Sequence, residues 1–290
     1  MKLLVKFNLI YVLVMALGVG VSGYLTRGLL IKNAQEEVLE HARLLIAKAN
    51  AVRNYTSGQI TKLLETQMKY EFLPQSVPSY SATEVLATLQ KSYPEYLYKE
   101  ATLNPTNPRD RAVGWEVDVV NQFRASADLK EVVGERDTPS GKAMFLAKPF
   151  RITNPACLQC HSSVEAAPKT LVDKYGPANG FGWNLNEVIG AQVIQVPQSV
   201  PLQRAEGSFK VFIGSLIAVF VVVGIVLNLM IWLVVVRPVT LLSDLADRVS
   251  QGDLAAPEFP GGGRDEIGVL AQSFSRMRNS VVQAMKMLES

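Results

Sequence analysis

Two cysteines and a histidine lie together in one short stretch, and their side chains can do chemistry. The stretch NPACLQCHSS holds the only two cysteines of a 290-residue chain and places Cys157, Cys160 and His161 in the pattern Cys-x-x-Cys-His. This pattern is typical of c-type haem attachment, in which both thiols bond to the porphyrin and the histidine binds the iron. Closely spaced thiols also occur in zinc sites and in redox dithiols.

The residues around the pattern favour haem over the two alternatives. A structural zinc site needs four ligands, and the chain has only one further histidine, His41, so carboxylates would have to complete the set. A thioredoxin-like dithiol is expected within a βαβ pattern, which this segment lacks. We therefore expect one covalent haem c with Cys157 and Cys160 as thioether residues and His161 as the proximal iron ligand.

The other face of the iron has no obvious protein ligand. The chain has no third cysteine, and no methionine lies between Met144 and Met230, so the distal methionine of a small cytochrome c is missing. The remaining candidates are Tyr55 and Met68, followed by Met144 and His41, or an open or water-filled position. Each candidate also has a structural interpretation, because tyrosines pack in cores and methionines fill gaps between larger side chains.

Other side chains are candidates for holding the haem rather than its iron. Trp183 and Phe181 follow the motif in a glycine-rich turn and are candidates to pack against the ring edge, with ordinary core packing as the default interpretation. The propionates are carboxylates that need charge-assisted partners. Candidate partners are Arg53, Arg109, Arg111, Lys148 and Arg151. The sequence contains no catalytic triad pattern and no phosphate-binding glycine loop, so an enzyme is not indicated.

Two apolar segments predict a membrane protein. Residues 211–236 contain no charged residue and exceed the roughly 20 residues that span a bilayer. Residues 7–25 form a second such run, which we interpret as an uncleaved anchor because no signal-peptidase pattern follows it. Asn228 is a candidate for a hydrogen bond between the two membrane helices. With 29 basic and 26 acidic residues the net charge is only +3, which does not suggest a nucleic-acid binder.

Small residues four positions apart predict where the membrane helices approach each other. The pairs are Ala16 with Gly20, Gly18 with Ser22, and Gly214 with Ala218. Lysine and arginine residues are nearly balanced on the two sides of each helix, so the positive-inside rule does not set the orientation.

The segment between the membrane helices has an α+β pattern. Apolar residues at helical spacing predict one long helix from about Lys32 to Lys69, whose buried face runs from Val38 to Leu63. Further helices are expected at residues 81–92 and 111–125. Period-two patterns bounded by proline, glycine and asparagine predict strands at residues 96–103, 130–136, 142–151 and 188–196.

After the second membrane helix, residues 237–290 predict two helices joined by a linker rich in proline and glycine. Leu242, Leu245 and Val249 form one apolar stripe. The second helix has apolar residues at coiled-coil spacing, namely Ile267, Leu270, Phe274, Met277 and Val281.

This segment resembles a HAMP signalling domain. The resemblance rests on Arg237 and Pro238 directly after a membrane helix, on Gly252 to Leu254, and on the run DEIG from Asp265 to Gly268. It implies a cytoplasmic, dimeric, parallel helical bundle that passes a conformational change from a membrane helix to an effector. No kinase or cyclase segment follows within this sequence, so we expect a separate effector.

The middle segment resembles the bacterial c-type haem sensor domain with a PAS-like fold. The resemblance rests on VPSYSA, YKEATLNPTNPRD, CLQCHSSVEAAP and YGPANGFGWNLNEVIGAQVIQVP, and it covers most of residues 35–200. It implies an antiparallel sheet with flanking helices around one haem. It also assigns the thioether bonds to Cys157 and Cys160 and the iron to His161.

Together these expectations describe a homodimeric sensor in the bacterial inner membrane. A redox change or a small ligand such as oxygen or nitric oxide would act on a periplasmic haem, and HAMP would pass the signal to a cytoplasmic partner. The alternative is a single-haem electron carrier or a subunit of a larger membrane complex. The expected parts are a cytoplasmic N-terminus at 1–6, membrane helices at 7–25 and 211–236, the haem domain at 26–210, and HAMP with a short coiled-coil end at 237–290.

Overall fold

The computed structural model describes residues 3–139, 141–253, 257, 263 and 265–288. The chain divides into two compact units, residues 27–207 and residues 1–26 with 208–290. Residues 1 and 2, most of the predicted linker before Asp265, and Leu254 of the HAMP-like pattern lie outside the described residues.

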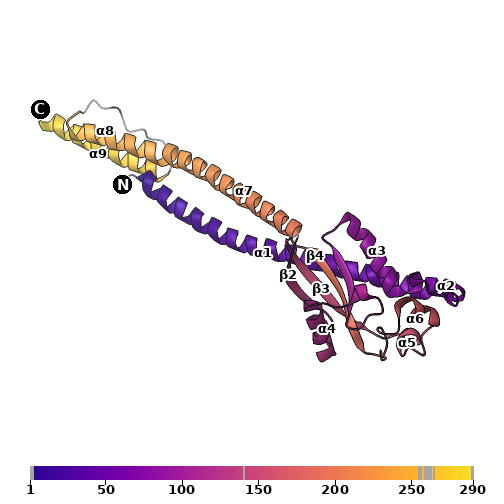
Figure 1. Cartoon of the computed structure of the whole chain (residues 1–290). Helices are drawn as coiled ribbons and strands as arrows, with labels where there is room; N and C mark the ends of the chain where they lie inside the picture. The colour runs from indigo at the N-terminus through magenta and orange to yellow at the C-terminus, as the bar shows by residue number, and fades with distance from the viewer. Residues whose placement is uncertain (1–2, 140, 254–256, 258–262, 264, 289–290) are drawn as a thin grey trace. The chain divides into compact units, whose positions relative to one another are not determined.

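The unit at residues 27–207 combines helices with one antiparallel sheet, which confirms the predicted α+β class (Figure 1). Its strands are β1 Leu97–Thr102, β2 Val132–Thr138, β3 Gly141–Arg151 and β4 Val188–Pro197. Its long helix consists of α1 Leu3–Tyr55, which begins in the other unit, the π-helix η1 Thr56–Ile60 and α2 Thr61–Met68. The shorter helices are α3 Pro78–Ser92, α4 Trp115–Ala125, α5 Leu158–His161 and α6 Lys169–Tyr175. The 3-10 turns are η2 Pro74–Ser76, η3 Pro108–Asp110 and η4 Pro155–Cys157.

The sheet has the strand order β1-β4-β3-β2, and every neighbouring pair is antiparallel. Strand β4 is central and is buried along nearly its whole length. All four strands lie where the period-two patterns predict them. The alternation of side chains along β3 and β4 then divides the core between the two faces of the sheet.

One face of the sheet packs against α1 and α3, and the other packs against α4 (Figure 1). Leu146 and Ile194 point toward α1, whereas Ala147 and Val193 point toward α4. Helix α4 begins at Trp115, four residues later than the sequence predicts, because Arg111 forms a bridge with Thr102 beside the sheet. Helix α6 was not expected from the sequence.

The long helix is confirmed, and Ile60 is half-buried on its predicted inner face, but that predicted face is wrong at Leu63. Leu63 is 75% exposed, and Leu64 is half-buried in its place. The cause is η1, because a π-turn holds one residue more than an α-turn and sets later residues back by about 100°. The helix therefore continues through the π-turn, but after it Leu64 and not Leu63 faces inward.

The other unit consists of helices. Two helical stretches, Leu3–Met68 and Ser199–Ser250, are long and apolar enough to cross a membrane. The second joins α7 Ser199–Ile231, a π-helix η5 Trp232–Val236 and α8 Arg237–Ser250. Asn8 and Asn228 exchange hydrogen bonds of 2.7 and 2.8 Å, so the bond expected for Asn228 is present, with Asn8 as its partner.

Of the predicted small residues, Gly18 faces the second candidate membrane helix, since a Cβ atom there would lie 4.0 Å from the Phe220 ring, but the tightest contacts are at glycines that were not predicted. A Cβ atom on Gly224 would lie 2.9 Å from Tyr11, and one on Gly23 would lie 3.2 Å from Ile213. At Gly20 and Gly214 an added Cβ would meet nothing within 4 Å. Spacing alone does not show which small residues face a neighbouring helix, because lipid-facing positions have the same spacing.

Helices α8 and α9 (Glu266–Leu288) pack side by side through buried Leu242, Leu245 and Ala271 (Figure 1). The Asp265 carboxylate accepts a hydrogen bond of 2.8 Å from the Gly268 N–H and caps α9, as the run DEIG indicates. Side chains of the predicted coiled-coil seam remain exposed in one chain, including Leu270, Met277 and Val281.

Candidate haem site

The two cysteines and the histidine project from one short helical segment formed by η4 and α5. The Asn154 carboxamide accepts a hydrogen bond of 2.9 Å from the Ala156 N–H and starts this turn. Residues three and four positions apart lie on the same side of a helix, so Cys157, Cys160 and His161 point in related directions. All three side chains line one cavity.

His161 is held in a defined orientation. Its Nδ1 lies 2.7 Å from the Gly180 carbonyl oxygen, and its ring stacks on Trp183 with centroids 3.9 Å apart and planes inclined by 16°. The Trp183 N–H also donates a hydrogen bond of 3.1 Å to the His161 carbonyl. A carbonyl can only accept, so Nδ1 carries the proton and Nε2 keeps its lone pair for a metal.

Burial shifts the pKa values of His161, Cys157 and Cys160 in the directions that favour their neutral forms. It lowers the pKa of His161, although the Gly180 hydrogen bond acts in the opposite sense, so the neutral ligand form is favoured. Burial also raises the pKa of both Cys157 and Cys160. Redox dithiols of the Cys-x-x-Cys type hold a thiol pKa low, so this environment does not favour that alternative.

The cavity has a volume of about 340 Å³ and is formed by several elements. One wall carries the cysteine motif with Trp183, and other walls come from α1, α2, α3, β1 and β3. Apolar side chains contribute much of the lining, which suits the flat face of a porphyrin. They are Met68, Phe72, Pro74, Val77, Pro78, Phe150, Ile152 and Leu171.

The zinc alternative lacks ligands in this geometry. Within the described part of the chain, no group of three or more His, Cys, Asp or Glu side chains is placed to hold a metal ion. A structural zinc site needs four such ligands. The cavity, the two thiols and the Nε2 of His161 instead fit a haem.

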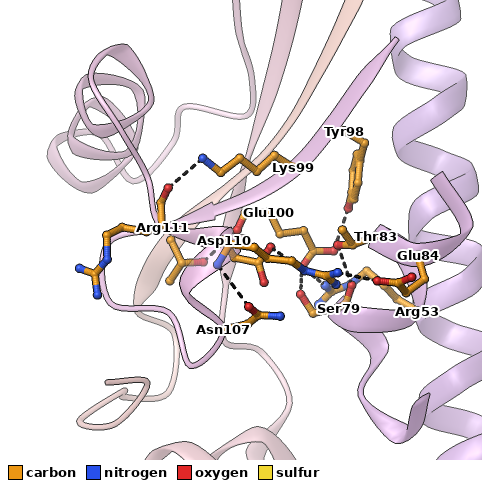
Figure 2. A network of polar contacts seen from close by, with 12 residues as sticks. Arg53, Ser79, Thr83, Glu84, Tyr98, Lys99, Glu100, Asn107, Asp110 and Arg111 are labelled. Atoms are coloured by element: carbon orange, nitrogen blue, oxygen red, sulfur yellow. Dashed lines mark hydrogen bonds and ion pairs between the residues drawn. The ribbon is translucent and has the colours of Figure 1, made fainter. Parts of the chain in front are cut away.

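A buried carboxylate forms the centre of a polar network in the wall of the cavity (Figure 2). Glu100, on β1, is 1% exposed. It accepts hydrogen bonds from Arg53 on α1, from Ser79 on α3, and from the Tyr98 hydroxyl at 2.8 Å. Arg53, Ser79 and Glu100 all line the cavity, so this network forms part of its wall.

The network ties helix α1 to the sheet. The Arg53 guanidinium also lies over the Phe150 ring, 4.5 Å from its centroid. Burial lowers the pKa of Arg53, but the Glu100 carboxylate more than offsets this and leaves the pKa raised. A second link joins Gln192 on β4 to Asn50 on α1 through a hydrogen bond of 2.9 Å.

Asp110 also lines the cavity, and its negative charge is less fully paired than that of Glu100. Its side chain is 16% exposed, and its contact with a cation is an ion pair of 3.6 Å with Nε of Arg109, which also bonds to Glu84. Burial raises the pKa of Asp110 to about 6, although Arg109 acts to lower it. Figure 2 shows Asp110 close to Asn107, at the end of the network.

The four distal candidates lie in different places. Met68 lines the cavity, but its sulfur already accepts hydrogen bonds from the Leu73 N–H and the Ser76 hydroxyl, both at 3.2 Å. Tyr55 is 54% exposed, and Met144 is buried in the core between α1 and the sheet. His41 is exposed on α1. Tyr55, Met144 and His41 are absent from the cavity lining.

The candidate propionate partners are also separated by the fold. Of the five, Arg53 lines the cavity. Arg109 bonds to Glu84 and lies over Tyr80, while Arg111 donates to Asn179 at 3.1 Å. The other two cations, Lys148 and Arg151, lie on β3, and neither is part of the cavity lining.

Sequence reasoning missed the residues that support the site. The Gly180 carbonyl, which orients His161, has no side-chain signature, although its glycine-rich turn was noted. Gly180 has φ of +87°, and a Cβ atom there would lie 2.0 Å from Oγ1 of Thr106. Only glycine fits this close approach without rearrangement. Glu100 gave no signal, since a charged residue in a predicted strand is usually solvated.

Comparisons with known proteins agree with both resemblances inferred from the sequence. Residues 230–283 match the HAMP domain. A similar solved structure is the crystal structure of the cyanobacterial haem protein Tll0287, with 16% identity and a TM-score of 0.45, covering 56% of this chain and 96% of that chain. No curated protein matches the chain. Residues 31–197, more than half of the sequence, match the Tll0287-like family model, and the chain therefore belongs to the Tll0287-like family.

Proposed function

We propose that this protein is a membrane-bound haem c sensor that passes a redox or small-ligand signal through its HAMP domain to a separate cytoplasmic partner. The observation that carries the proposal is His161, which follows Cys-x-x-Cys and lines the cavity with Nδ1 bonded to Gly180. This leaves Nε2 free for iron beside two thiols that can anchor a porphyrin. The solved relative is itself named as a haem protein.

Each residue of the site has a distinct role in the proposal. Cys157 and Cys160 form the thioether bonds, His161 binds the iron, and Trp183 covers the ring of His161. When bound, haem supplies an iron that changes oxidation state or takes up a diatomic ligand. We assign no protein ligand to the second axial position, because Met68, the candidate that lines the cavity, has its sulfur engaged in hydrogen bonds.

The remaining architecture supports a sensor. Two helices suited to crossing a membrane flank residues 27–207, and the second leads directly into the HAMP domain. HAMP domains typically occur in dimeric signalling proteins. The HAMP bundles that this segment resembles are cytoplasmic, so we place this domain in the cytoplasm and residues 27–207, with a PAS-like fold, in the periplasm. We propose a homodimer in the bacterial inner membrane that acts without catalysis.

The energy required for signalling is modest. A signal shifts a two-state element only by its differential affinity for the two states, and a few kcal/mol moves most of the population. Arg53 and Glu100 line the cavity and join it to α1, and β4 leads toward α7. Helices α1 and α7 both continue into candidate membrane spans, so a small displacement at the cavity can be passed along continuous helices to the membrane.

The first experiment tests the haem. The full chain is produced with a cytochrome c maturation system, and the haem is extracted with acid and acetone. We expect one haem to remain with the protein, whereas a Cys157→Ser Cys160→Ser variant releases its haem. The matched His161→Ala variant should keep the thioether bonds but lose the absorption bands of axial histidine ligation. Complete extraction from the unaltered chain would overturn the proposal.

The second experiment tests signalling. Spin labels are attached at Leu270→Cys and Met277→Cys in the dimer, and distances are measured in the oxidised, reduced and gas-bound forms. We expect the label separation to differ between at least two forms. Unchanged separations, combined with fast electron exchange with a soluble donor, would favour the single-haem electron carrier instead.

A further inference from the structure

An exposed apolar stripe runs along the long helix from Leu44 to Leu63 and ends at Tyr70, in the turn that follows the end of the helix at Met68. It is formed by Leu44, Tyr55, Leu63 and Tyr70, which are 54%, 54%, 75% and 85% exposed. The smaller residues Ala47 and Ala51 are also exposed and lie between Leu44 and Tyr55. Contiguous exposed apolar side chains on a folded domain commonly mark an interaction surface.

These residues lie on one side of the helix because of the π-turn. At about 100° per residue, Leu44, Ala51 and Tyr55 fall within about 40° of one another. In an uninterrupted α-helix Leu63 would lie about 100° away from Leu44. The π-turn at Thr56–Ile60 sets it back by about one residue, so Leu63 returns to the stripe, and Tyr70 follows two residues after the helix ends at Met68.

The stripe lies away from both the core and the cavity. The opposite side of the helix packs on the sheet through Val38, Ala42 and Ala49, and its later turns present Met68 to the cavity. None of the stripe residues is part of the cavity lining. The exposure of Tyr55 therefore needs an explanation other than iron ligation.

We propose that the apolar stripe is the surface through which two copies of this domain pack in the membrane-bound dimer. This inference rests on the proposed function, which makes the protein a dimer through its HAMP domain. Two copies anchored in the same membrane present their α1 helices in parallel, so the same stripe on each copy can meet across a two-fold axis. Ala47 and Ala51 give the close approach that parallel helices need.

The stripe alone is too small for a stable dimer, which makes the contact dependent on the rest of the chain. A tyrosine buries about 150–250 Å², so two tyrosines and two leucines supply on the order of 500 Å² per copy. Stable interfaces bury about 800 Å² per partner. Tethering by the HAMP domain and the membrane helices raises the effective concentration and compensates for the difference. A contact of this strength can open and close with the signal.

The test uses single cysteine substitutions in the full, haem-loaded chain in native membranes. Ala51→Cys places a thiol at the centre of the stripe, and Ala87→Cys places one on α3 as a matched exposed alanine. Met277→Cys, on the coiled-coil seam, reports whether HAMP dimers form. After mild oxidation, we expect Ala51→Cys and Met277→Cys to form disulfide-linked dimers, with about tenfold less product from Ala87→Cys.

A second substitution makes the test specific to the stripe. Leu63→Glu adds a charge at an exposed position, so the fold is unaffected, and we expect it to reduce cross-linking of Ala51→Cys about tenfold without affecting Met277→Cys. Cross-linking at Met277→Cys with none at Ala51→Cys, or equal yields at Ala51→Cys and Ala87→Cys, would overturn the inference. Haem staining of the same gel shows separately whether the haem proposal holds, and the absence of every cross-link would overturn the dimer itself.

Discussion

Two walls of the same cavity are built in opposite ways. The motif wall, residues 154–161, carries the reactive groups on a short half-buried turn held by hydrogen bonds to neighbouring backbone. The network wall, formed by Arg53, Ser79 and Glu100, carries no reactive group, but its central carboxylate is buried and paired with Arg53, with Ser79 and with the Tyr98 hydroxyl outside the lining. Chemistry and rigidity are therefore assigned to different walls, and altering each wall should have different consequences.

The largest expected effect comes from breaking the network wall. Glu100→Ala leaves the Arg53 guanidinium in its partly buried position without its carboxylate. Removing one partner of a buried ion pair typically costs about 3–5 kcal/mol. For a domain of this size we expect Tm to fall by roughly 10 °C, measured by circular dichroism on the full chain in detergent.

A matched change identifies the ion pair as the cause. Glu84→Gln alters an ion pair with Arg109 whose carboxylate is 47% exposed, and it should lower Tm by less than about 3 °C. Equal effects from the two substitutions would mean that the network wall is not more rigid than an ordinary surface. The buried ion pair of the network wall would then contribute no more to the free energy of unfolding than an exposed ion pair does.

The motif wall should respond to a change that leaves its reactive residues in place. Gly180→Ala adds a Cβ atom that would lie 2.0 Å from Oγ1 of Thr106, at a residue with φ of +87°. We expect a loss of about 2–3 kcal/mol from the strain and the clash. Because the Gly180 carbonyl bonds to Nδ1 of His161, the haem absorption spectrum should shift as well.

Gly176→Ala is the control for backbone strain alone. Gly176 has φ of +80°, but a Cβ atom there meets nothing within 4 Å. It should cost about 2 kcal/mol, because φ of 80° with ψ of 170° is a conformation that is essentially restricted to glycine, and it should leave the haem spectrum unchanged. A spectrum that stays the same in Gly180→Ala would show that the carbonyl does not orient the histidine, and that the motif wall depends on Trp183 stacking instead.

The two walls also differ in how far the sequence predicts them. The motif wall follows from local spacing, because Cys157, Cys160 and His161 lie within five residues and the fold only has to present them to a cavity. The network wall joins Arg53 to Glu100, which are 47 positions apart in the sequence. Long-range pairing of two charges leaves no periodic pattern, and each residue alone resembles a solvated one.

The same reasoning explains the error on the long helix. Its existence and its buried residues from Val38 to Ala49 follow from helical spacing, and the strands follow from period-two patterns. The π-turn at Thr56–Ile60 has no sequence signal of this kind, so the predicted face was wrong from Leu63 onward. One inserted residue therefore moved Met68 to the cavity and Leu63 to the surface.

The smallest expected effect concerns Asp110, which belongs to neither wall and is the poorly compensated carboxylate of the cavity. Its folded-state pKa of about 6 lies above the ordinary value of 3.8, so the folded chain binds this proton more tightly than the unfolded chain. Stability from this group is present below about pH 4 and is lost as the pH rises to about 6. Asp110→Asn removes this loss and should stabilise the protein at pH 8 by about 1–2 kcal/mol, after a discount for partial exposure.

The pH dependence distinguishes this effect from a simple packing change. The difference in Tm between Asp110→Asn and the unaltered chain should be near zero at pH 4, grow through pH 6 and be constant at pH 8. Asp128→Asn, at an exposed aspartate, should give no such trend. A difference for Asp110→Asn that is the same at every pH would show that the pKa of Asp110 does not differ between the folded and unfolded chains, because Arg109 offsets the cost of burying the carboxylate.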